Sequence, residues 1–125
     1  MATAKDIMGG GFAASQATAL GGNYGTVAAA GSVIGDATAL TASNNVITAA
    51  DGTKGVALVG NIGDSVWVFN NSGSTLKVWP DSSSAAISVA GTGLGTAAAA
   101  YSHTTYATVI YKKITATQWL ADKSA

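Results

Sequence analysis

The sequence predicts an all-β protein: an antiparallel β-sandwich or a jelly-roll-like barrel of short strands, preceded by an extended N-terminal arm. Three observations predict this class. Short segments rich in β-branched and aromatic residues recur along the chain, turn-forming Gly, Asn, Asp and Ser residues separate them, and 125 residues fit one compact domain. We expect a flexible arm over residues 1–14 and a single all-β domain over residues 15–125.

The expected arm has no hydrophobic periodicity and contains three consecutive glycines at positions 9–11. Its larger apolar side chains, Ile7, Met8 and Phe12, are candidate anchors on another surface. They are the first members of a predicted interface.

A short internal repeat follows the arm. The tetrapeptide Ala-Thr-Ala-Leu ends both SQATAL at 15–20 and GDATAL at 35–40, an interval of twenty residues. Turn-forming residues come after each copy, which is typical of short strands that end in loops.

Seven further segments are predicted to be strands or to contain one. They are NVITAA at 45–50, GVALV at 55–59, DSVWVF at 64–69, TLKVWP at 75–80, AAYSH at 99–103, YATVIY at 106–111 and TATQWLA at 115–121. Four alanines within 96–101 favour a helix locally, but β-branched residues follow almost at once, so we expect a strand there.

Two strands, at 65–69 and 75–79, are expected to form a β-hairpin around the turn-forming segment 70–74. In the first strand Val66 and Val68 share one face, and Trp67 and Phe69 share the other. A strand that is apolar on both faces is either covered on both sides or contacts another subunit. Pro80 is expected to end the second strand.

The two tryptophans of this segment have different expected roles. Packing is the leading role for Trp67, together with a share in an intersubunit face, and Trp79 is the more exposed candidate. Trp67, Phe69 and Trp79 complete the predicted interface.

Composition favours assembly with other chains. Charged residues make up 10% of the sequence, with six Lys, six Asp and a net charge of zero, and 26 of the 60 hydrophobic residues are alanine. Such a surface does not keep copies apart by repulsion. A sparsely charged monomer is the alternative.

The sequence argues against an enzyme and against a metal or cofactor site. No cysteine is present, and His103 is the single histidine, expected to be exposed or at an interface. We therefore expect no enzyme activity, no catalytic residue, no metal site and no cofactor. GTGLGT at 91–96 lacks the spacing of a phosphate loop and is expected to be a flexible loop. The Asn70-Asn71-Ser72 sequon and the Asp-Gly and Gly-Asp pairs are expected to form turns.

We also expect the chain to bind neither nucleic acid nor a membrane. The chain has no arginine and no lysine cluster beyond positions 112–113, so it lacks the concentrated positive charge that phosphate contacts need. It has no apolar run of about 18 residues and no signal peptide.

The order of several short motifs resembles a domain found in virion proteins of tailed bacteriophages. The matching elements are Leu40-Thr41, Gly55-Val56-Ala57-Leu58, Gly63-Asp64-Ser65-Val66, Asn70 to Gly73, Val78-Trp79-Pro80 and Thr115-Ala116-Thr117-Gln118-Trp119. The resemblance covers about residues 35–121 and depends on order and spacing, since no single motif is specific.

This resemblance implies a capsid decoration, or cement, protein. Such a protein would form a small all-β homotrimer, bind the major capsid protein on the outer surface of the phage head, and stabilise the shell. It would be made in the cytoplasm of the bacterial host, and its arm would lie across a neighbouring capsid subunit.

Three alternatives stay open. Trp79 with Asp81 could form a carbohydrate-binding platform, and a fibre or appendage domain is the nearest rival to a decoration protein. A virion-bound hydrolase using His103 is the third. The chain starts with Met1 and ends soon after its last expected strand, which favours a stand-alone decoration protein over a fibre domain.

Overall fold

The computed structural model describes residues 24–89 and 92–123 and has an all-β fold, as the sequence predicted. The first six strands are β1 (Tyr24–Ala28), β2 (Thr38–Ala39), β3 (Asn44–Ala49), β4 (Gly55–Ala57), β5 (Ser65–Asn70) and β6 (Leu76–Trp79). The last five are β7 (Ala86–Val89), β8 (Thr92–Thr96), β9 (Tyr101–His103), β10 (Thr108–Thr115) and β11 (Gln118–Lys123). A 3-10 turn, η1 (Ile34–Asp36), precedes β2.

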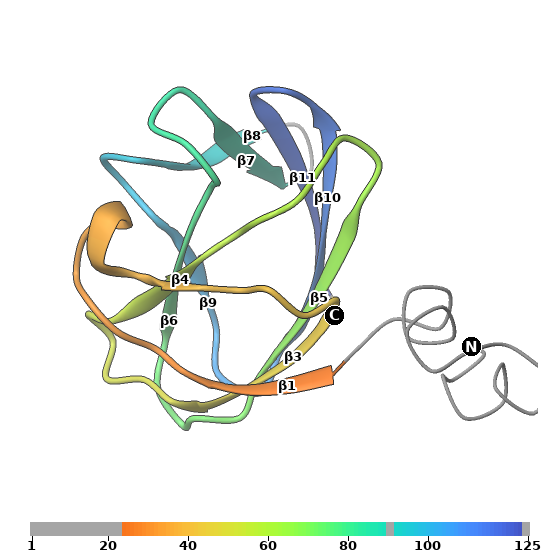
Figure 1. Cartoon of the computed structure of the whole chain (residues 1–125). Helices are drawn as coiled ribbons and strands as arrows, with labels where there is room; N and C mark the ends of the chain where they lie inside the picture. The colour runs from red at the N-terminus through yellow and green to blue at the C-terminus, as the bar shows by residue number, and fades with distance from the viewer. Residues whose placement is uncertain (1–23, 90–91, 124–125) are drawn as a thin grey trace, which may run out of the picture.

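The strands form two sheets that enclose the core (Figure 1). A seven-stranded sheet has the order β1-β3-β5-β10-β11-β7-β8, and a four-stranded sheet has the order β2-β4-β6-β9. Alternate residues of facing strands meet between the sheets, as expected for a sandwich or barrel. The largest fully buried side chains include Trp119 and Tyr111 from the first sheet and Leu76 and Val78 from the second.

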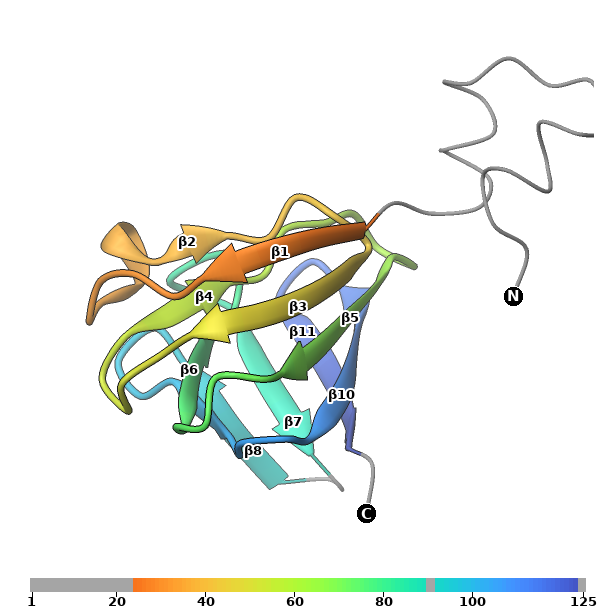
Figure 2. The same ribbon diagram turned by 90° about the horizontal axis from the view of Figure 1, so that it is seen from below.

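The chain alternates between the two sheets from β1 to β7. Strands two apart in sequence therefore become parallel neighbours: β1, β3 and β5 lie side by side in one sheet (Figure 2), and β2, β4 and β6 in the other. Among the nine strand pairs of the described residues, five are parallel and four antiparallel. The sandwich or barrel predicted from the sequence is therefore mixed and not antiparallel.

The predicted hairpin between residues 65 and 79 is also wrong. β5 and β6 belong to different sheets, and the segment between them crosses from one sheet to the other. β5 pairs with β3 and β10, whereas β6 pairs with β4 and β9. Adjacent strands with turn residues between them indicate a chain reversal but do not specify the strand that each one pairs with. Pro80 does follow the last residue of β6, as predicted.

Two predictions near position 96 are also wrong. GTGLGT was expected to be a loop, but Thr92–Thr96 forms β8 and pairs with β7. The alanines at 97–100 form neither a helix nor a strand: they make a bend, and β9 begins only at Tyr101. Within this bend Thr96 N donates to the Ala99 carbonyl, and Ala99 N donates to the Thr96 hydroxyl oxygen, which offers the chain an alternative to a helix.

Candidate interaction surface

Apolar side chains gather on the outer face of the seven-stranded sheet. Val66 and Val68 of β5 are buried, so the alternation along the strand turns Trp67 and Phe69 outward; the sequence predicted that these two share a face, but not that this face is the outer one. Cross-strand partners share a face, and the register aligns Trp67 with Ile110 and Phe69 with Val46. We call Val46, Trp67, Phe69, Ile110 and Leu120 the outer apolar face.

Its members keep contact with solvent in the described part of the chain. Trp67 is 37% exposed and Leu120 is 44% exposed, while Val46, Phe69 and Ile110 are half-buried. Lys112 and Asp122 are exposed on the same face, because they pair with Leu120 and Ile110 respectively. The face thus combines apolar side chains with one charge of each sign, a composition suited to contact with another protein.

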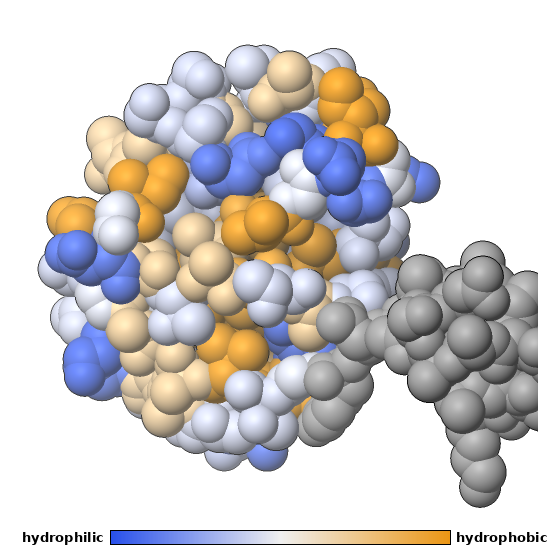
Figure 3. Space-filling view, viewed as in Figure 1, coloured by the Kyte–Doolittle hydropathy of each residue, from blue (hydrophilic) through white to orange (hydrophobic). Residues whose placement is uncertain are grey.

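The rest of the surface is also weakly charged. Figure 3 shows pale and apolar residues over most of the visible side, with strongly hydrophilic residues in small separate groups. This distribution agrees with the 10% charged composition of the chain.

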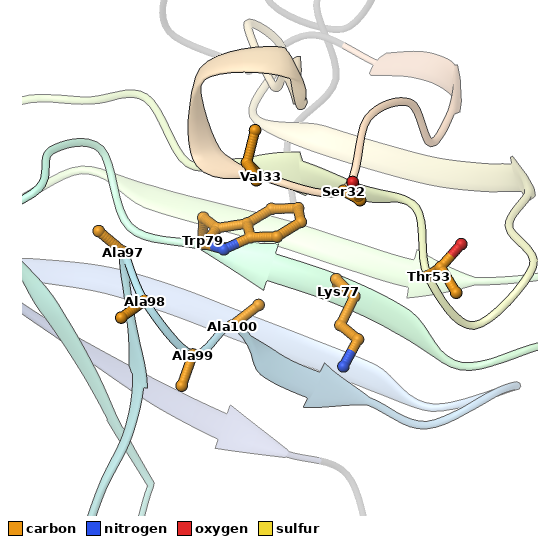
Figure 4. A pocket seen from close by; sticks show the side chains of 9 residues that line it. All are labelled: Ser32, Val33, Thr53, Lys77, Trp79, Ala97, Ala98, Ala99 and Ala100. Carbon is orange, nitrogen blue, oxygen red and sulfur yellow. The ribbon is translucent and has the colours of Figure 1, made fainter.

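The exposure of the two tryptophans is the reverse of the prediction. Trp79 is only 4% exposed, whereas Trp67 is 37% exposed. Leu76 and Val78 of β6 fill the core, so Trp79 points to the outer face of the four-stranded sheet. It is buried there because two loops, around residues 32–33 and 97–100, lie against it (Figure 4). Those loops are distant in sequence, so strand alternation alone cannot predict this burial.

A groove of about 240 Å³ remains beside Trp79. Its wall residues are Ser32, Val33, Thr53, Lys77, Trp79 and Ala97 to Ala100. Figure 4 shows the Lys77 side chain next to the indole, with the alanines opposite. Across the sheet Lys77 pairs with neutral residues, Gly55 on β4 and Ser102 on β9, so neither neighbouring strand places a carboxylate opposite it. The groove therefore offers hydroxyl groups, methyl groups and one cation to a small ligand. The sequence analysis did not identify it.

Asp81 does not form a carbohydrate platform with Trp79. Its carboxylate accepts a hydrogen bond from Trp119 Nε1 at 3.0 Å and forms an ion pair with Lys113. Lys113 also donates to the Gly60 carbonyl at 3.2 Å. Desolvation raises the pKa of Asp81, but the hydrogen bonds from Lys113 and Trp119 outweigh it, so the pKa is lowered overall. These contacts hold three separate segments together, which is a structural role.

His103 is fully buried, so the expectation of an exposed or interface histidine is wrong. Its Nε2 donates to the Ala107 carbonyl at 2.7 Å, and its Nδ1, 2.9 Å from the Tyr111 hydroxyl, then accepts from that group. Burial lowers the pKa of His103 and raises that of Tyr111 well above its ordinary value. The neutral ring thus ties β9 to the loop before β10 and to β10 itself.

The predicted turn residues do form turns. Asp51 Oδ1 accepts from the Thr53 hydroxyl and from the Thr53 and Lys54 amides, and these bonds lower the pKa of Asp51 to about 2. Asn70 of the sequon, predicted to be part of a turn, is instead the last residue of β5; it is buried, and its side chain bonds to Ser72 and to the backbone of Ser74.

Ile7, Met8 and Phe12, the predicted anchors of the arm, lie outside the described residues. Within residues 24–89 and 92–123 no group of three or more His, Asp or Glu side chains could hold a metal ion. The same part of the chain contains no helix of sufficient length and hydrophobicity to span a membrane.

Only part of the outer apolar face was predicted from the sequence. Trp67 and Phe69 were predicted from their alternation with buried valines, but Val46, Ile110 and Leu120 were not. The same alternation was present around each of them, as in Asn45-Val46-Ile47. Their common location depends on the pairing of β3, β5, β10 and β11, which the sequence does not specify.

Comparison of the chain with protein-family models, with curated proteins and with solved structures found no match.

Proposed function

We propose that the chain is a structural virion protein that decorates the outside of an assembled bacteriophage head as a homotrimer and stabilises the shell. The observation that carries the proposal is the outer apolar face. Contact with water of a sheet face that has a 37% exposed tryptophan among four other apolar side chains is unfavourable. Burial of these side chains against another protein lowers the free energy. A protein with such a face is expected to function as part of an assembly.

Charge and motif order support the same function. With a net charge of zero, copies of the chain approach one another without repulsion. The motifs that resemble phage decoration domains run through β2 to β11, the part of the chain that builds both sheets.

The stabilising mechanism is linkage. A protein that binds the assembled shell, but not the separated subunits, shifts the equilibrium toward the shell by the free energy of that binding. In a trimer three modest contacts reinforce one another, because each bound copy raises the effective concentration of the others. In this proposal the chain is made in the bacterial cytoplasm and binds the major capsid protein on the outer capsid surface.

The first test is the mass of the purified protein by light scattering, followed by co-sedimentation with capsid shells of the phage that encodes it. We expect a mass of three 12.2 kDa chains and saturable binding to shells. A mass of one chain together with no binding to shells would overturn the proposal.

A pair of substitutions links that test to the outer apolar face. Trp67→Lys places a charge in the middle of the face and is expected to weaken self-association or shell binding by tenfold or more, about 1.4 kcal/mol. Val33→Lys is the matched control, because Val33 is an exposed apolar residue on a loop over the other sheet. Equal effects of the two substitutions would exclude the outer apolar face as the contact.

The arm is tested separately. Deletion of residues 1–12 removes Ile7, Met8 and Phe12 and is expected to weaken binding to the shell. Binding that is unchanged by this deletion would remove the arm from the proposed contact.

A fibre or appendage domain is the alternative location for the same kind of assembly. Immunogold labelling of virions separates the two: label over the head supports decoration, and label confined to the tail or fibres supports the alternative.

A carbohydrate-binding role is the second candidate function, and the groove beside Trp79 favours it. Lys77 and the hydroxyl groups of Ser32 and Thr53 suit a sugar with an acidic group. Titration with sodium glucuronate, observed by tryptophan fluorescence, is expected to give a saturable change that Lys77→Met removes and glucose does not produce. No change with glucuronate would exclude this role for the groove.

A further inference from the structure

Four side chains of β10 and β11 form a rectangle on the outer side of the seven-stranded sheet. The two strands are antiparallel neighbours, with Ile110 opposite Asp122 and Lys112 opposite Leu120. The residues between them in each strand are buried, so these four side chains point outward. The two apolar side chains therefore occupy one diagonal of the rectangle, and the lysine and the aspartate occupy the other.

The two charges of this rectangle are available to a partner. The ion pair of the described residues joins Lys113 to Asp81 and involves neither Lys112 nor Asp122. Each of these two charges is opposite an apolar residue, and their backbones are about 8 Å apart along the diagonal. An uncharged protein surface on this face would bury both charges without counter-charges, which is unfavourable. The partner must therefore present one charge of each sign beside apolar side chains.

We propose that the outer apolar face binds the same face of a second copy, across a two-fold axis along the Ile110–Leu120 diagonal. A two-fold contact uses the same patch on both copies. Rotation about this axis sets Ile110 against Ile110 and Leu120 against Leu120. It also brings Lys112 of each copy to Asp122 of the other.

The other two-fold axes in the plane of the rectangle do not fit. An axis along the strands, or one across them, sets a charge against an apolar residue at every corner. An axis along the second diagonal sets Lys112 against Lys112 and Asp122 against Asp122. The arrangement of the four side chains therefore selects one axis.

Trp67 takes part in the same contact. It is opposite Ile110 on β5, on the side away from Asp122, and it is 37% exposed. The rectangle measures about 4.8 Å between strands and about 6.8 Å along them, so the strands of the two copies cross at about 70°. At this angle Trp67 of each copy lies over Ile110 of the other. A central tryptophan is a common source of binding free energy in protein contacts.

The inference rests on the proposed function in one respect, since it names the partner that covers the outer apolar face. A two-fold contact joins two chains and not three. In the proposed decoration layer it therefore links copies that belong to neighbouring trimers. The contact itself requires neither a trimer nor a capsid, so it can be tested on the purified chain.

Two complementary charge reversals test the contact. Lys112→Asp leaves two negative charges on the diagonal, and Asp122→Lys leaves two positive charges. Each variant alone is expected to self-associate about tenfold more weakly than the natural chain, because like charges meet across the axis. An equimolar mixture of the two is expected to recover association to within about threefold of the natural chain, because each aspartate then meets a lysine.

Sedimentation velocity over a range of concentrations measures this association. Lys54→Asp is the matched control, because Lys54 is an exposed lysine directly before β4 of the other sheet. It has the same change of charge as Lys112→Asp and is expected to leave self-association unchanged. Circular dichroism checks that all the variants fold.

Recovery in the mixture supports the two-fold contact, because only a pairing of position 112 with position 122 between copies restores it. A mixture that associates no better than the separate variants overturns the inference. Self-association that the two reversals leave unchanged, or a natural chain that does not self-associate, also overturns it.

Co-sedimentation with shells, carried out in parallel, separates this inference from the proposed function. Shell binding without recovery in the mixture would remove the two-fold contact and leave the decoration function in place. Recovery without shell binding would support the two-fold contact and count against decoration.

Discussion

At the scale of single residues, two side chains that the sequence predicted at the surface are buried. Trp79 and His103 were expected at the surface, yet both are buried, one under loops and one inside a hydrogen-bonded network. The two causes differ. Trp79 is on the outer side of its sheet and is covered by loops from other parts of the chain, whereas His103 pairs with the core residue Leu76 and faces the interior of the protein.

His103 predicts a pH dependence of stability. Its pKa in the folded state lies below the ordinary value of 6.5, so the unfolded chain binds the proton more readily. The contribution of His103 to the free energy of unfolding is complete above about pH 6.5. It falls as the pH decreases from there to the folded-state pKa, by at most about 1.4 kcal/mol per pH unit. The charged and titratable groups near the ring are Tyr101, Tyr111 and Lys123.

Urea unfolding between pH 7.5 and 5 measures this dependence. His103→Gln is the control, because it lacks a titrating ring and is expected to remove the slope between pH 6.5 and 5. An unchanged slope in this variant would assign the dependence to another group.

Gly55 predicts a steric effect at one position. A Cβ there would lie 2.3 Å from the Lys77 carbonyl oxygen and 2.4 Å from a ring carbon of Trp79. Gly55→Ala is therefore expected to destabilise the protein by about 1–3 kcal/mol. Gly35→Ala is the matched control, since a Cβ at Gly35 meets nothing within 4 Å, and its effect is expected to stay within about 0.5 kcal/mol. Thermal unfolding compares the two, and equal losses would contradict the steric explanation.

At the scale of elements, separate segments are held together by a small number of polar contacts. Asp81 follows β6, Lys113 is on β10, and Trp119 is on β11. The contacts of Asp81 therefore join the four-stranded sheet to the central hairpin of the other sheet. Because the side chains of Asp81 and Lys113 are 16% and 12% exposed, water replaces lost contacts poorly.

Asp81→Ala is expected to lower the free energy of unfolding by about 1–3 kcal/mol, because it leaves the Trp119 N–H without its acceptor and the Lys113 ammonium without its counter-charge, with the Gly60 carbonyl alone as partner. Asp122→Ala removes an exposed carboxylate from β11 and serves as the control, with an expected change within about 0.5 kcal/mol. Chemical denaturation measures both, and a loss at position 122 as large as that at 81 would argue against the cluster.

At the scale of the whole molecule, the seven-stranded sheet presents the outer apolar face to the surroundings of the described residues. If copies associate through it, the midpoint of thermal unfolding must rise with protein concentration, because association stabilises the folded state by mass action. We expect a rise across a hundredfold range of concentration in the natural chain and a smaller one in Trp67→Lys. A midpoint independent of concentration in the natural chain would mean that the folded protein is monomeric over this range. This measurement needs no capsid and is independent of the location of the protein on a virion.

The amino-acid sequence determined the all-β class, the positions of most strands, the turns and the common face of Trp67 and Phe69. These properties depend on neighbours in sequence: alternation fixes the two faces of a strand, and Asp, Asn and Gly fix the turns.

Only the tertiary structure decided the pairing of β1 to β6, the burial of Trp79 and His103, and the union of Val46, Phe69 and Ile110 in one face. These properties depend on which sheet each strand joins. The apolar faces of all the strands are similar, so the choice of partner is made by the packing of the whole chain.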